Sequence, residues 1–80
     1  MNKTIERSIG NNIRNLRESR GLTQELLAAM LQLQGVDITR SALAKIEVGQ
    51  RHIYPDEMIA IKKVLRVSYD EIFEYERKVN

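Results

Sequence analysis

The residues of this chain that can do chemistry are hydrogen-bond donors and cations near a short predicted helix that begins after Thr39. Arg40, Ser41 and Lys45 lie on the faces of that helix that its apolar residues leave open. These side chains are polar, and two of them are positively charged, so they suit contact with a polyanion. A helix of this kind fits the major groove of DNA, where its side chains can reach base edges. We therefore expect duplex DNA as the partner.

Other kinds of chemistry have little support in the composition. The chain has no cysteine, and His52 is its one histidine, which cannot hold a metal ion alone. No nucleophile, carboxylate pair or metal cluster occurs at a usable spacing. We expect no enzymatic activity, no cofactor, no metal and no small-molecule ligand. We expect four acidic residues to lie on helix exteriors and to need only solvation: Glu6, Glu18, Glu25 and Glu57.

Several helices must position the candidate DNA-binding residues. From Thr4 to Arg20, apolar residues recur at steps of three and four, which predicts an amphipathic helix. Gly21 can supply the left-handed residue that ends it. A second helix is predicted to begin after Thr23, its N-cap, and to run to about Leu33.

The third predicted helix carries the candidate DNA-reading side chains. Thr39 can cap it, and Ala42, Leu43 and Ile46 form its inward stripe until Gly49 ends it. The outward side of this helix is therefore short, polar and basic.

Two more helices complete the predicted fold. Pro55 opens a fourth helix, and Ser68 with Glu71 makes a capping box for a fifth. No segment alternates as a strand would, and 80 residues suffice for one core. We expect an all-α fold in one domain, residues 1–80.

Several segments in order carry a resemblance to a known family. They read IGNNIR at 9–14, LR at 16–17, RGLTQ at 20–24, SALAKIEVG at 41–49 and LRVSYDEIF at 65–73. Together they resemble the Cro and lambda-repressor-like (XRE) helix-turn-helix domain over residues 9–73, leaving 74–80 as a C-terminal tail. The resemblance implies a compact five-helix lambda-repressor-like domain. In it, helices 2 and 3 form the helix-turn-helix, and helix 3, at about 40–47, reads the major groove.

The resemblance assigns base reading to the start of helix 3. Arg40, Ser41 and Lys45 occupy the base-reading positions of the family. An arginine can bind guanine O6 and N7 with two hydrogen bonds, and a serine hydroxyl serves either a base or a phosphate. The alternative for all three is a solvated helix face.

The resemblance also implies contacts with the DNA backbone. Gln24 would donate to a phosphate and can touch a base at the edge of the site, with an ordinary solvated helix start as the alternative. Thr39 would contact a phosphate besides capping helix 3, and Arg51 would bind one from the following loop. His52 and Tyr54 can add hydrogen bonds there, with no DNA role as the equal alternative.

A structural ion pair is implied between helices 1 and 3. In the family, the acidic residue that closes the recognition helix pairs with an arginine in the last turn of helix 1. Those positions match Glu47 and Arg17 here. A DNA contact is the alternative role for Arg17.

One segment departs from the family pattern. The stretch from Gln32 to Thr39 is about five residues longer than the usual tight turn. Either the second helix gains a turn or the turn becomes a loop, and both outcomes affect the angle of helix 3. Asp37 would oppose an approach of this stretch to the DNA backbone.

A homodimer is expected, because two half-sites about 34 Å apart supply the base contacts that one small domain lacks. The hypothetical interface consists of Tyr69, Phe73, Tyr75 and Val79, with core packing as the alternative for Phe73.

The expected function is that of a sequence-specific DNA-binding transcriptional regulator, with repression as its expected mode. The charge is uneven along the chain. The residues up to Tyr54 hold eight Lys and Arg against five Asp and Glu, while those after it hold five against six. The positive excess before Tyr54 favours contact with a polyanion such as DNA. The alternative is a protein-interaction module of the same fold, such as an antitoxin, an adaptor or an antagonist of another regulator. No membrane partner and a cytoplasmic location are expected, since no stretch resembles a membrane span or a signal peptide.

Overall fold

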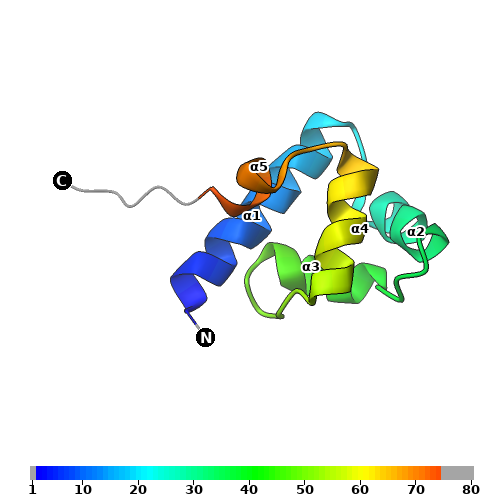
Figure 1. Cartoon of the computed structure of the whole chain (residues 1–80). Coiled ribbons are helices and arrows are strands. Elements are labelled where there is room, and N and C mark those ends of the chain that lie inside the picture. The colour runs from blue at the N-terminus through cyan, green and yellow to red at the C-terminus, as the bar shows by residue number, and fades with distance from the viewer. Residues whose placement is uncertain (1, 75–80) are drawn as a thin grey trace.

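The computed structural model describes residues 2–74, and within them the chain forms five helices and no strand (Figure 1). The helices are α1 (Lys3–Ser19), α2 (Gln24–Leu33), α3 (Arg40–Glu47), α4 (Pro55–Leu65) and α5 (Tyr69–Phe73). The predicted starts of all five lie within one residue of those observed. The predicted all-α, five-helix fold is therefore confirmed.

Side-chain caps fix where the helices of the central motif begin. The Thr23 hydroxyl accepts a hydrogen bond of 3.0 Å from the Leu26 N–H, and the Thr39 hydroxyl accepts one of 3.1 Å from the Ala42 N–H. Each such cap stabilises its helix by about 1 kcal/mol. Both threonines thus set the register of the short helices that follow them.

One apolar core lies between the helices. α1 packs against α3 and α5, while α2 packs against α3 and α4. The helix faces that meet here carry the apolar stripes expected from the sequence. The fully buried side chains are Ile13, Leu27, Leu31, Ile38, Leu43, Ile46, Ile61, Leu65 and Ile72.

The connection between α2 and α3 is a loop, residues 34–39, that contributes to this core. Val36 and Ile38 are buried, and the Gln32 side-chain amide donates a 3.0 Å hydrogen bond to the Ile38 carbonyl. Gly35 turns the chain at a φ of +84°. Of the two outcomes expected for the extra residues, the structure has the loop.

α1 crosses the end of α3 at Gly10, where the two backbones approach closely. A Cβ at Gly10 would lie 2.1 Å from the Ile46 carbonyl oxygen and 2.9 Å from that of Glu47. Gly49, at a φ of +77°, turns the chain directly beside Arg7 of α1. The position of α3 is thus set by backbone contact with α1.

α5 closes the domain against α1 (Figure 1). The Asn12 side-chain amide donates to the carbonyl oxygens of Ile72 and Glu74, at 2.9 and 2.8 Å. Ile72 itself is fully buried. These contacts join segments about 60 residues apart in the sequence.

Candidate nucleic-acid interface

The outward face of α3 holds the predicted base-reading residues. At 3.6 residues per turn, Arg40, Ser41, Ala44, Lys45 and Val48 fall within an arc of about 140° around the helix axis. Arg40, Ser41 and Lys45 are exposed, as is Val48 at the C-cap. The structure therefore brings the three predicted residues to one surface and adds two apolar positions. Helical spacing places Ala44 on this side from the sequence alone, and the same spacing identifies Val48.

A buried network holds this helix in place. The Arg17 guanidinium donates to both oxygens of Glu47, at 2.7 and 3.0 Å, and to the Leu22 carbonyl at 2.6 Å. The hydrogen bonds to Glu47 raise the pKa of Arg17 despite its burial. Because these groups belong to α1, the turn before α2 and the end of α3, the network fixes the angle between the helices.

Gln24 belongs to the same network. Its side-chain nitrogen donates a 2.9 Å hydrogen bond to Oε1 of Glu47. A side-chain amide has two N–H donors, so one remains for the phosphate contact that the sequence predicts. The structure thus gives Gln24 an internal partner that sequence reasoning missed.

The loop between α3 and α4 is organised by Arg51 and Glu57. Two Arg51 nitrogens lie 2.9 and 3.0 Å from the two Glu57 oxygens, and the Tyr54 N–H donates to the same carboxylate at 3.0 Å. Burial works to raise the pKa of Glu57, but these hydrogen bonds outweigh it and hold that pKa below its ordinary value. The bond to Glu57 likewise raises the pKa of Arg51.

The expectation that Glu57 needs only solvation was wrong. Glu57 is 5% exposed, because its position as third residue of α4 turns its carboxylate back over the Tyr54 N–H. The signal was in the sequence, since Glu57 follows Tyr54 at capping-box spacing. Arg51, predicted to bind a phosphate, has its guanidinium committed to this carboxylate and its side chain 27% exposed.

His52 and Tyr54 lie on the surface of the same loop. His52 Nδ1 is 3.1 Å from Oε1 of Glu6, which connects the loop to α1. Tyr54 is 59% exposed, and the Arg51 guanidinium lies 5.6 Å from its ring centre. Both side chains therefore have partners within the described part of the chain.

Two of the four predicted dimer residues form an exposed aromatic pair. Tyr69 and Phe73 are 40% and 46% exposed, and their ring centres are 6.3 Å apart. They border an apolar groove whose other walls come from the α3–α4 loop and α4. Tyr75 and Val79 lie outside the described residues.

Residues 2–74 hold neither a metal site nor a membrane-spanning helix. No group of three or more histidine or acidic side chains is arranged to hold a metal ion. No helix in that range is long and apolar enough to cross a membrane.

Known proteins resemble this chain both in sequence and in structure. A helix-turn-helix family model, HTH_3, matches residues 13–72. The restriction-modification controller protein C.AhdI from Aeromonas hydrophila superposes with a TM-score of 0.78 at 27% identity, covering 89% of this chain and 96% of that protein. No curated protein sequence gives a significant match.

Proposed function

The chain belongs to the HTH_3 helix-turn-helix family of DNA-binding regulators, and from this premise we propose that it represses transcription by reading the DNA major groove with α3. The likeness to a controller protein supports a regulatory role. Repression is the simplest mode for a domain of this size, because occupying an operator excludes other proteins. We also propose that residues 1–80 form one domain and that the protein is cytoplasmic.

The observation that carries the proposal is the outward face of α3. Arg40, Ser41 and Lys45 share it, and the Arg17–Glu47 network behind it is buried. The hydrogen bonds of this network do not use the side chains of Arg40, Ser41 or Lys45, so these side chains are available to DNA. Arg40 can bind guanine O6 and N7 together, which discriminates by about 1–3 kcal/mol.

Backbone contacts would flank this face. Thr39 and Gln24 lie at the starts of α3 and α2, where backbone N–H groups favour phosphate oxygens. Arg51 is proposed as a weaker contact, because its nitrogens also serve Glu57.

We propose that the protein acts as a homodimer through the surface around Tyr69 and Phe73, with Tyr75 and Val79 extending it. The exposed aromatic pair beside an apolar groove supports this, since such surface is favourably covered by a partner. A two-fold dimer would present two α3 helices to half-sites about 34 Å apart.

The test is selection from a pool of random duplex DNA, followed by sequencing. The variant Arg40→Ala, Lys45→Ala removes two cations from the α3 face. A matched control, Lys63→Ala with Arg66→Gly, removes two from the end of α4, and glycine suits the left-handed backbone of Arg66, with a φ of +56°.

A two-fold-symmetric motif enriched by the wild type and the control, and lost in the α3 variant, is the expected outcome. If the wild type enriches nothing even at low salt, the protein-interaction module of the same fold becomes the better reading. An unsymmetric motif would argue against the dimer alone.

A further inference from the structure

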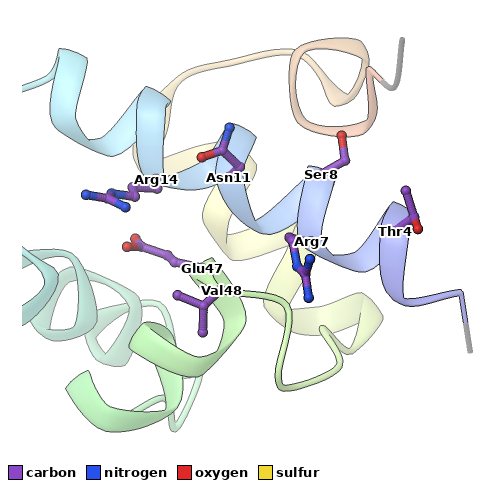
Figure 2. Close-up of a pocket in the computed structure, with 7 residues that line it drawn as sticks. All are labelled: Thr4, Arg7, Ser8, Asn11, Arg14, Glu47 and Val48. Carbon is purple, nitrogen blue, oxygen red and sulfur yellow. The ribbon is translucent and has the colours of Figure 1, made fainter. Parts of the chain in front are cut away.

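A groove opens between α1 and the end of α3. Arg7, Asn11 and Arg14 line it from α1, and Val48 lines it from α3. Figure 2 shows Arg7 extending from α1 toward the level of Val48, at the edge of the recognition helix. The groove is open to solvent rather than enclosed.

The charge in this groove is positive. Arg7 and Arg14 are both exposed and lie seven residues apart, so they share one side of α1 at a separation of about 10 Å along its axis. Among residues 2–74, Arg7 makes no ion pair. Arg14 lies 3.6 Å from Glu18, but both side chains are half exposed and such a pair is weak.

The one acidic residue that lines the groove does not oppose an anion. The Glu47 side chain is 1% exposed, and its two oxygens accept hydrogen bonds from Arg17 and Gln24. Its charge is therefore matched by the Arg17 guanidinium. Hydroxyl groups of Thr4 and Ser8 add donors along the same wall.

The groove is continuous with the proposed DNA-reading surface. Val48 lies near the middle of the outward arc of α3 and also lines the groove. A duplex seated on Arg40 and Lys45 would pass this end of α3 next. The surface beyond α3 that it meets is the side of α1 that carries Arg7 and Arg14.

We propose that this groove binds the sugar-phosphate backbone of the same duplex, with Arg7 and Arg14 each contacting a phosphate. This inference rests on the proposed function and enlarges the DNA contact from α2 and α3 to α1. Phosphate contacts position a protein on DNA without reading sequence. The groove therefore adds affinity and orientation, while α3 retains the choice of operator.

The experiment is a salt titration of DNA affinity with the selected operator and with random duplex DNA. The variants are Arg7→Ala, Arg14→Ala and the two combined, and Lys63→Ala, which removes an exposed cation from α4, is the control. Each lost phosphate contact should reduce the slope of log affinity against log salt by about 0.9. The slope for the combined variant should thus fall by about 1.8. The affinity should fall by the same factor for the operator and for random DNA.

The outcomes separate the two proposals. If the α1 variants keep the slope of Lys63→Ala while Arg40→Ala still loses the operator, the groove proposal is overturned and the proposed function stands. If the wild type binds neither DNA, both are overturned. Thermal unfolding of each variant checks that the fold is intact, as expected for substitutions at two exposed side chains.

Discussion

Gly10 is the glycine at which an added methyl group would meet the closest neighbouring atom, in the contact between α1 and α3. The Cβ of Gly10→Ala would stand 2.1 Å from the Ile46 carbonyl oxygen, which is backbone and cannot rotate away. We expect Gly10→Ala to lower the free energy of unfolding by about 3 kcal/mol, as overpacking does at a tight contact. Urea unfolding measures this.

The control is Asn15→Ala, on an exposed face of the same helix. Alanine has the higher helix propensity, so this variant should be neutral or slightly more stable. Equal stability of the two variants would show that α1 and α3 do not touch at Gly10.

Glu57 makes stability depend on pH in the acid range. Its pKa in the folded protein lies below the ordinary 4.5, since hydrogen bonds from Arg51 and Tyr54 outweigh burial. The unfolded chain therefore takes up the proton first as pH falls. The stabilisation is present above about 4.5 and is lost as pH falls through the folded-state pKa.

Glu57→Gln should flatten this dependence and cost about 1–3 kcal/mol at neutral pH, because it leaves the Arg51 guanidinium without its charged partner. Chemical unfolding from pH 7 to pH 3 measures both effects. Glu25→Gln, which removes an exposed carboxylate from α2, is the comparison. If both variants changed the pH dependence of the unfolding free energy equally, Glu57 would not be the source of the acid sensitivity.

At the scale of elements, the α2–α3 loop acts as part of the core. Ile38 is fully buried although it lies in a connection. We expect Ile38→Ala to cost about 2–4 kcal/mol, as for other buried large-to-small substitutions. Asp37→Ala, at the exposed neighbouring residue, should leave the unfolding midpoint nearly unchanged. A similar midpoint for Ile38→Ala would mean that the loop packs loosely.

The helices were predictable because each has a local signal: Thr23, Thr39 and Ser68 as caps, and glycine or proline at the boundaries. The burial of Val36 and Ile38 in the α2–α3 loop was not predictable, because apolar residues without periodicity do not reveal which way they face. Likewise, the outward face of α3 follows from helical spacing alone. The Gln24–Glu47 bond and the groove beside Arg7 depend on how helices cross, which no local pattern encodes.

At the scale of the whole molecule, the proposed dimer depends on the surface around Phe73. Replacing this 46% exposed ring by serine should weaken self-association at least tenfold, because buried aromatic residues often dominate interfaces. Sedimentation equilibrium measures the change. Ile5→Ser, on α1 at 38% exposure, is a control for lost apolar surface in general. Wild-type protein that remains monomeric, alone and on the operator, would end the dimer proposal.

The amide of Asn12 has a consequence for the order in which the protein is assembled during synthesis. Its partners, the carbonyls of Ile72 and Glu74, leave the ribosome about 60 residues later. Until then α1 lacks its contact with α5, and the space that Ile72 fills stays open. Both α2 and α3 leave the ribosome well before α5, and the domain is complete only after α5. A nascent chain therefore contains α3 before its core is complete.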